Sequence, residues 1–113
     1  MHELSLMMAA MEQATASARR NGAERIHRIR MRVGILSGAQ PEALEFAFET
    51  LRPGTAAEDA RLEIERIPAT FRCEQCGKTF TIQEVNFECP ECDGPMTLVG
   101  GGRELELADM EIS

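Results

Sequence analysis

The first part of the chain places its apolar residues with the period of an α-helix. Between residues 4 and 20 they recur at spacings of three and four, a stripe made of Leu4, Met7, Met8, Met11, Ala14, Thr15 and Ala18. Asn21 and Gly22 follow, and both residue types tolerate the left-handed backbone conformation that ends a helix. The pattern predicts an amphipathic helix over residues 4–20, with its methionines in a core rather than around a soft metal.

Residues 26–36 change to strict alternation, which predicts a half-buried β-strand. One face would carry His27, Ile29, Met31, Val33 and Ile35. The other face carries three arginines, which we name the arginine row: Arg28, Arg30 and Arg32. His27 is a candidate metal ligand, but nothing near it in the sequence completes a ligand set. A position at the rim of the core is therefore favoured for this histidine.

A second helix and a second strand follow from the same kinds of pattern. Pro41 suits the first position of a helix, and Pro53-Gly54 ends it. The buried stripe of this helix would consist of Leu44, Ala47, Phe48 and Leu51. Alternation over residues 60–67 then predicts a strand that Pro68 ends.

The end of the chain predicts a last strand over residues 103–112, after a glycine hinge at residues 100–102. The apolar positions of this strand change parity between Leu107 and Met110. A change of parity within one strand indicates an extra residue, so we expect a β-bulge around residues 108–109.

The most specific stretch of the chain is CEQCGKTFTIQEVNFECPEC. Its two C-x-x-C pairs comprise Cys73, Cys76, Cys89 and Cys92. Each C-x-x-C turn places two thiolates on one side of a metal, and two such turns joined by a hairpin complete a tetrahedron. An apolar patch beneath the hairpin would be supplied by Phe71, Phe80 and Phe87. The spacing predicts a zinc ribbon with a closed, structural Zn(II) site.

Two other uses of the four cysteines compete with zinc. Disulfides form in oxidising compartments and are rare in a reduced cytosol. Iron in a rubredoxin-like centre uses the same sulfur ligands, so the ligand set alone does not separate it from zinc. Zinc is the favoured interpretation.

The chain opens with a set of potential metal ligands. The α-amine of Met1, the backbone nitrogen of His2 and the His2 imidazole can close adjacent chelate rings, and Glu3 can add an amide or carboxylate ligand. Ni(II) and Cu(II) hold a deprotonated amide in tetragonal geometry. A histidine at the second position is commonly incidental. The alternative is a helix start, with Glu3 near the positive end of the helix dipole.

The charge balance argues against a general nucleic-acid binder. The chain has 12 Lys and Arg residues against 19 Asp and Glu, a formal net charge of −7, whereas phosphate binding needs positive potential. The arginine row could still form a local anion or RNA surface. Cross-strand ion pairs are favoured, because no aromatic residue is interleaved with the row to stack bases. The expected partners are Glu63, Glu65, Glu104 and Glu106.

The sequence also limits where the protein is located and which chemistry it performs. No apolar run approaches the roughly 20 residues that span a bilayer, and the N-terminus lacks the regions of a secretory signal. We therefore expect a cytoplasmic protein without a membrane partner. An enzyme is the least favoured class, because GILSG differs from the G-x-S-x-G nucleophile elbow and no His/Asp pair accompanies a nucleophile.

The chain resembles the HypA/HybF family of hydrogenase-maturation nickel metallochaperones nearly from end to end. The shared segments are Met1-His2-Glu3-Leu4-Ser5, Gly34 with Leu36-Ser37-Gly38, Pro41-Glu42-Ala43-Leu44, Phe46-Ala47-Phe48-Glu49, Cys73-x-x-Cys76-Gly77, Cys89-Pro90-x-Cys92 and Gly102-Arg103-Glu104-Leu105. One turn departs from the family pattern, because Asp93 rather than glycine directly follows the last cysteine.

The resemblance implies an α+β fold: a small three-stranded sheet with two helices on one face, and an inserted zinc-ribbon module. Residues 1–68 and 101–113 would form the nickel-binding domain, and residues 69–100 the zinc ribbon. In that family nickel is held at the Met-His-Glu terminus, which maps onto Met1, His2 and Glu3. Zinc is held by the paired cysteines, which map onto Cys73, Cys76, Cys89 and Cys92.

The resemblance also implies a non-enzymatic nickel carrier, with Ni(II) as transient cargo and Zn(II) as a structural ion. Its expected partners are a GTPase of the HypB type and the large subunit of [NiFe]-hydrogenase, with urease maturation proteins in some organisms. The rival hypothesis is a zinc-ribbon module that binds protein or nucleic acid and delivers no nickel. In that case the N-terminal segment would be only a helix start.

Overall fold

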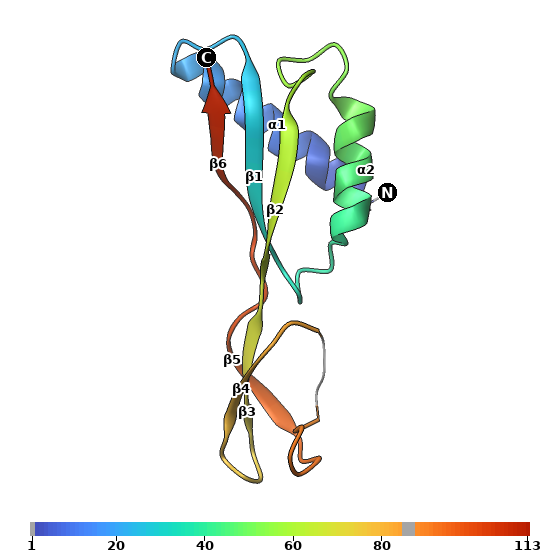
Figure 1. Cartoon of the computed structure of the whole chain (residues 1–113), viewed down its shortest axis with the longest axis vertical. Coiled ribbons are helices and arrows are strands. Elements are labelled where there is room, and N and C mark those ends of the chain that lie inside the picture. The colour runs from blue at the N-terminus through green and yellow to red at the C-terminus, as the bar shows by residue number, and fades with distance from the viewer. Residues whose placement is uncertain (1, 85–87) are drawn as a thin grey trace.

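The structure, a computed structural model, describes residues 2–84 and 88–113 and contains two helices and two small sheets in that part of the chain (Figure 1). In chain order the elements are α1 (His2–Arg20), β1 (Ile26–Gly34), α2 (Pro41–Leu51), β2 (Arg61–Ile67), β3 (Ala69–Cys73), β4 (Thr79–Ile82), β5 (Met96–Gly101) and β6 (Leu105–Ile112). One sheet has the strand order β2-β1-β6, and the other has the order β4-β3-β5. The expected α+β fold with an inserted ribbon is confirmed.

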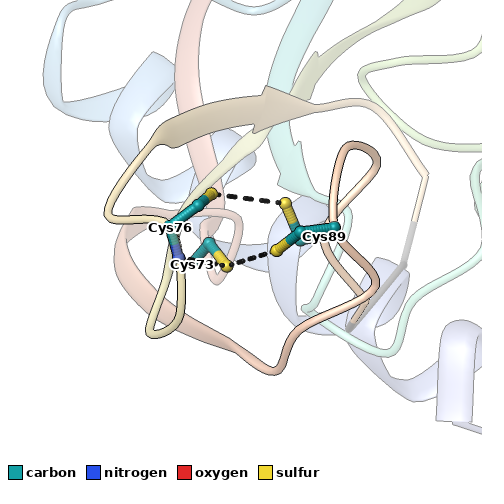
Figure 2. Close-up of side chains that lie close together, drawn as sticks. Cys73, Cys76 and Cys89 are labelled. Carbon is teal, nitrogen blue, oxygen red and sulfur yellow. Dashed lines mark hydrogen bonds between the residues drawn. The ribbon is translucent and has the colours of Figure 1, made fainter.

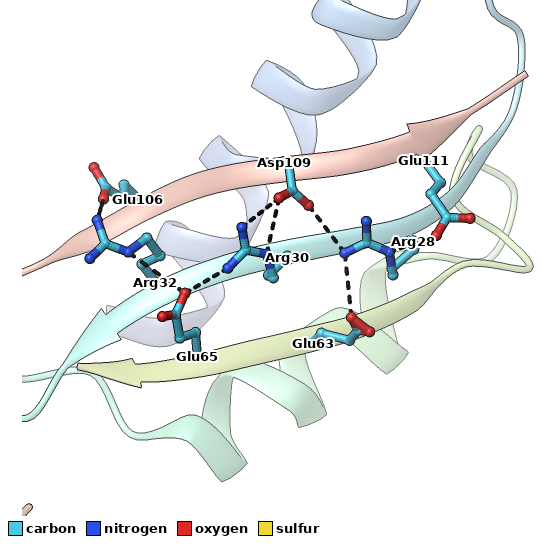
Figure 3. Close-up of polar contacts among 8 residues, drawn as sticks. All are labelled: Arg28, Arg30, Arg32, Glu63, Glu65, Glu106, Asp109 and Glu111. Atoms are coloured by element: carbon cyan, nitrogen blue, oxygen red, sulfur yellow. Dashed lines mark hydrogen bonds and ion pairs between the residues drawn. The ribbon is translucent and has the colours of Figure 1, made fainter. Parts of the chain in front are cut away.

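Strand β1 is the centre of the first sheet. It pairs in parallel with β2, and α2 lies in the connection between these strands; it pairs antiparallel with β6. Both helices cover the face of this sheet opposite to the arginine row (Figures 1 and 3). The side chains between the helices and the sheet are fully or almost fully buried, among them Met7, Ala14, Ile29, Val33, Leu44 and Phe48. No described helix has the length and apolar character needed to cross a bilayer.

Helix α1 confirms most of the expected stripe but begins two residues earlier, at His2. Met7 and Met11 are buried, whereas Met8 is 47% exposed. Successive helical residues are rotated by about 100°, so Met8 cannot share the core-facing line of Met7. The expected end of the helix is confirmed, because Gly22 has a φ of 75°.

His27 does not lie on the buried face of β1. The pairing of β1 with β6 is irregular between Ile26 and Arg28, and Ile26 takes the buried position while His27 is exposed. The His27 Nε2 atom lies 2.6 Å from the Ser113 hydroxyl. Among the described residues, the cluster that could hold a metal consists of the four cysteines and does not include this histidine.

The expected bulge in β6 is confirmed. Arg30 of β1 pairs with Asp109, and the next residue, Met31, pairs with Leu107, so Ala108 is the extra residue. The bulge lets Leu107 and Met110, which differ in parity, both pack against the core of the first sheet.

The arginine row lies between the carboxylates of β2 and β6 (Figure 3). Arg28 binds Glu63 and Glu111 at 3.3 and 3.0 Å. Arg30 binds Glu65 at 2.6 Å and Asp109 at 2.5 Å, and Arg32 binds Glu106 at 2.7 Å. Cross-strand pairing is confirmed. Because these guanidinium groups already bind carboxylates, they give no support to an anion or RNA surface.

Two details of this network differ from expectation. Asp109 and Glu111 are additional partners, which the bulge and the end of β6 bring beside the row. Glu104 was expected as a partner but makes no ion pair within the described residues, and its Oε1 atom is buried without a hydrogen-bond donor. The N–H of Gly34 donates to the Glu104 carbonyl, so the β1 residue beside Glu104 has no side chain to offer.

The two sheets meet where the end of β1 crosses the strand connections. The Ile35 N–H donates to the Ile67 carbonyl at 3.0 Å, and the Leu36 N–H donates to the Gly102 carbonyl at 2.6 Å. Ile35 is buried with Ala69 and Phe71, in the small core of the second sheet. The segment after β1 is therefore shared by both sheets.

The glycine run predicted as a hinge has a more specific structural role. Gly101 and Gly102 have φ values of 74° and 90°, which L side chains rarely adopt. A Cβ on Gly102 would lie 2.8 Å from the Ala69 Cβ. The glycines thus permit a sharp turn and a close backbone approach at the crossing.

Gly34→Ala should destabilise the protein by at least about 3 kcal/mol, because its Cβ would lie 2.1 Å from the Gly102 carbonyl oxygen. Gly100→Ala is the control, since a Cβ at Gly100 has no heavy atom within 4 Å. Urea unfolding of the zinc-loaded protein, followed by circular dichroism, measures both changes. Equal stabilities of the two variants would show that the crossing relaxes without cost.

Asp109→Asn should lower the free energy of unfolding at neutral pH. Hydrogen bonds from Arg30 and the nearby guanidinium charges lower the pKa of Asp109 below its ordinary value. This contribution is fully present above the ordinary pKa and is lost as the pH falls through the lowered value. Urea unfolding at several values between about pH 7 and pH 3 should therefore show a loss in the variant that shrinks towards acid.

Asp59→Asn is the matched control for this series, because the Asp59 side chain is 82% exposed and meets Arg25 only at 3.8 Å. Any effect of acid on the zinc site is common to both variants, so their difference isolates the network. A loss at Asp109 that is no larger than the loss at Asp59 would contradict this account.

Candidate metal centres

The ribbon builds its cysteine site from two similar turns. In the first turn the Gly77 N–H donates to the Cys73 carbonyl at 3.0 Å, and in the second the Asp93 N–H donates to the Cys89 carbonyl at 2.9 Å. Strand β3 ends at Cys73, which fixes the first turn to the middle strand of the second sheet. Each turn presents two sulfurs to the same point.

The four sulfurs have the spacing of a tetrahedral thiolate site. The Sγ atoms of Cys73, Cys76, Cys89 and Cys92 all lie within 4.8 Å of one another. The sulfurs of Cys73 and Cys92 are 3.4 Å apart, and those of Cys76 and Cys89, both labelled in Figure 2, are 3.8 Å apart. A tetrahedron with Zn–S bonds of about 2.3 Å has sulfur–sulfur edges of about 3.8 Å. The donor set and its spacing therefore fit zinc, with no position left open for a substrate.

Backbone N–H groups stabilise negative charge on the first thiol. The N–H groups of Cys76 and Gln75 each lie 3.4 Å from the Cys73 sulfur. These backbone contacts, together with side-chain hydrogen bonds with the Cys92 and Cys76 thiols, lower the pKa of Cys73 to about 6. The Gly94 N–H acts in the same direction on Cys92, but hydrogen bonding with Cys73 and burial outweigh it and raise the pKa of Cys92 to about 12. One thiolate thus forms easily, and a cation is needed to hold four.

The surroundings of the site close it on two sides. Cys73 and Cys89 are each 1% exposed. Lys78, from the first turn, binds Glu91, from the second, at 2.9 Å. Phe71 is buried and pairs in register with Phe80 across β3 and β4, but the small core that contains Phe71 is completed by Ile35 and Ala69 rather than by Phe80. Phe87, the third member of the expected apolar patch, lies outside the described residues.

Asp93 explains how this chain manages without the glycine expected after its last cysteine. Asp93 has a φ of 60°, and among the described residues it is the one non-glycine residue with a left-handed backbone. Gly77 holds the equivalent position after the first pair, with a φ of 75°. Aspartate is among the few residue types that adopt this conformation at low cost. The departure from the family pattern therefore preserves the turn.

The N-terminal segment lies in a different part of the molecule. Met1 lies outside the described residues. His2 and Glu3 form the first turn of α1, and His2 is exposed. Glu3 Oε2 accepts a hydrogen bond from the Gln40 N–H at 3.3 Å. Hydrogen bonds from the Glu3 and Gln40 backbones lower the pKa of the Glu3 carboxyl.

Gln40 is a residue that the sequence patterns did not single out. It is the N-cap of α2 and makes no capping hydrogen bond with its own side chain. The Glu3 carboxylate lies at this helix start instead, where an N-terminal dipole favours negative charge. Because the two residues are 37 positions apart, no local signal could have paired them.

Asp93→Val should weaken zinc retention by roughly tenfold, because a β-branched residue resists the left-handed conformation by about 1–2 kcal/mol. Asp93→Gly is the matched control and should retain zinc at least as well as the parent, since glycine adopts a φ of 60° freely. Competition with a chromophoric zinc chelator at fixed pH measures both. A valine variant that holds zinc as tightly as the glycine variant would show that the turn does not need this backbone conformation.

The family described as "Hydrogenase/urease nickel incorporation, metallochaperone, hypA" matches residues 1–112. The hydrogenase maturation factor HypA of Rhizobium leguminosarum bv. viciae is 43% identical over 112 residues, which cover 99% of each chain. The protein of the same name from Picosynechococcus sp. is 42% identical with the same coverage.

Solved structures agree on the fold. The solution structure of the Ni metallochaperone HypA from Helicobacter pylori has a TM-score of 0.66 at 24% identity, covering 97% of this chain and 96% of that one. A second solution structure, of a HypA protein, has a TM-score of 0.67 at 25% identity, covering 100% and 97%. The chain belongs to the HypA family of nickel metallochaperones for hydrogenase and urease maturation, whose members are not enzymes.

Proposed function

We propose that this chain carries Ni(II) at its N-terminus, with Met1, His2 and Glu3 as ligands, while Cys73, Cys76, Cys89 and Cys92 hold a structural Zn(II). The observation that carries the nickel assignment is the contact between Glu3 and the Gln40 N–H at 3.3 Å. It ties the first turn of α1 to the start of α2, so the terminal ligands are attached to a rigid layer of two helices. A metal carrier benefits from such attachment because the ligands need less ordering when the ion arrives.

The chemistry of the terminal segment suits Ni(II) cargo. The first N–H groups of a helix have no acceptor within the helix, so the amide nitrogens of His2 and Glu3 are not committed to the α1 ladder. Together with the amine and an imidazole they offer nitrogen donors for a tetragonal ion. Protonation of the amine or imidazole competes with the metal, so affinity falls on acidification and release is possible.

Selectivity for nickel requires a source outside the ligand set. The Irving–Williams order gives Cu(II) the higher intrinsic affinity for nitrogen ligands. The supply of metal in the cytoplasm and the identity of the receiving protein would then decide which ion is carried. We propose as partners a GTPase of the HypB type and the large subunit of [NiFe]-hydrogenase, with urease maturation proteins where urease is present.

Zinc would stabilise a part of the fold that has little core of its own. The buried cluster of the second sheet consists of Ile35, Ala69 and Phe71, and Ile35 belongs to the segment after β1. Metal binding therefore supplies much of the folding free energy of residues 69–100, as in other small zinc modules. We propose that these residues act as one domain and residues 1–68 with 101–113 as the other.

The test is a calorimetric Ni(II) titration of zinc-loaded protein with its native Met1, beside the same protein with an N-terminal tag and beside His2→Ala. We expect one Ni(II) per native chain, and at least about tenfold weaker binding in the other two, because each removes a nitrogen ligand or its geometry. His27→Ala is the control, since His27 lies at the far end of β1 and contacts Ser113.

Equal nickel binding by the native and tagged proteins would show that nickel binds at a site other than the terminus. Absence of nickel binding by all of them would remove the carrier function at this site. Circular dichroism and zinc content, measured on each sample, separate a lost nickel site from a lost fold.

A further inference from the structure

Two adjoining hollows lie where the second sheet meets the first, at the narrow waist of the molecule (Figure 1). One has a volume of about 480 Å³, lies at the bend between β5 and β6, and is lined by Leu98, Val99, Gly100, Gly101, Arg103 and Glu104. The other has a volume of about 400 Å³ and is lined by Leu36, Ser37, Phe71, Leu98 and Arg103. Leu98 and Arg103 belong to both linings, so the two hollows meet at these side chains.

The charged groups of the first hollow are not used by the fold. Arg103 is exposed, and within residues 2–84 and 88–113 its side chain forms no ion pair or hydrogen bond. The arginine row differs, because each of its guanidinium groups binds a carboxylate. Glu104 also makes no ion pair in the described chain, and its Oε1 atom is buried without a donor. The wall of this hollow therefore offers an unpaired cation and an unsatisfied acceptor side by side.

The strand beside these charges presents an open edge and an outward apolar side chain. Within the described part of the chain, β5 lies at the edge of its sheet and pairs with β3 alone. Phe71 pairs with Leu98 and Thr70 with Gly100, so Val99 is the extra residue of a bulge, and it is 51% exposed. Bulges at sheet edges redirect side chains. The outer edge of β5 can therefore accept a further strand, with Val99 beside it.

We propose that these two hollows bind an extended peptide segment of another protein, with an acidic side chain between two apolar ones. The carboxylate binds Arg103, and the apolar side chains enter the hollows on either side of Leu98. The backbone of the segment pairs with the outer edge of β5, and one of its N–H groups donates to Glu104. A strand added to a sheet edge gains affinity from main-chain hydrogen bonds and specificity from side-chain pockets.

Charge complementarity favours an acidic segment over a basic one. The free guanidinium of Arg103 lies on an apolar lining, and a contact between a guanidinium and a carboxylate is strong and directional. The proposal does not depend on the nickel assignment, because none of the proposed nickel or zinc ligands lines either hollow.

The experiment measures binding of labelled heptapeptides to the zinc-loaded protein by fluorescence polarisation, at up to about 1 mM protein. The probe is a pool with aspartate at the fourth position and leucine, valine, isoleucine or phenylalanine at the second and sixth, with threonine elsewhere. Alternate residues of a strand face the same side, so these three side chains point together at the site. A second pool is identical except for asparagine at the fourth position.

The parent should bind the aspartate pool at least about tenfold more tightly than the asparagine pool, and Arg103→Gln should remove this difference. Arg20→Gln is the matched control, because Arg20 is also exposed and unpaired in the described chain but lies in the last turn of α1. Circular dichroism and zinc content establish that each variant keeps its fold.

Gly100→Val tests the hollow itself. A Cβ at Gly100 has no heavy atom within 4 Å, and valine suits a strand, so the new side chain occupies the hollow without displacing the protein. This variant should bind the aspartate pool at least about tenfold more weakly. The proposal is wrong if the parent binds neither pool or both alike, if Arg103→Gln binds like Arg20→Gln, or if a folded Gly100→Val binds like the parent.

Discussion

The close approach of Gly34 to the Gly102–Arg103 backbone is the constraint on which the two-sheet arrangement depends. The position of a Cβ on Gly34 is already occupied by the Gly102 carbonyl, so only glycine fits at the end of β1. This contact brings the connection from β5 to β6 against the central strand. It thereby lets Leu36 donate its N–H to Gly102 and lets Ile35 enter the small core of the ribbon. The ribbon is held to the helical sheet through backbone contacts as well as through its two chain connections.

The same segment continues from the crossing to the N-terminus. After Leu36 it reaches Gln40, whose N–H binds the Glu3 carboxylate, and then enters α2. One short stretch therefore touches the second sheet at one end and the proposed nickel ligands at the other. A movement of the ribbon that displaced Ile35 would be transmitted along the backbone to Gln40, whose N–H binds Glu3. This is a physical connection of the kind that coupling between sites requires, and it runs along a single piece of chain.

Local patterns were enough for most of the fold. Period alone placed both helices and the strands of the first sheet, and the parity change in the last strand located its bulge at Ala108. The pairing of the arginine row with glutamates followed from opposite charges on neighbouring strands. Two of the failures lie in β1: an irregularity in pairing between Ile26 and Arg28 leaves His27 exposed, and the absence of a side chain at Gly34 leaves Glu104 without an arginine.

The candidate sites also differ in how well local sequence patterns predict them. The cysteine cluster was predictable because two C-x-x-C turns impose their geometry locally, and a strand pairing suffices to bring them together. The contact between Glu3 and Gln40 was not predictable, because it depends on how α1 and α2 pack. Sequence patterns identify a site whose parts are local and miss one assembled by packing.

The contrast between the cysteine cluster and the proposed nickel site has a simple physical reason. A structural ion must stay, and the ribbon therefore surrounds it with four sulfurs, two of them fully buried, and a cross-turn ion pair between Lys78 and Glu91. A cargo ion must leave, and His2, one of the proposed nickel ligands, is exposed on the first turn of α1, where solvent can reach it. The proposed assignment thus separates retention from release, with the retained ion in the ribbon and the cargo ion at the first turn of α1.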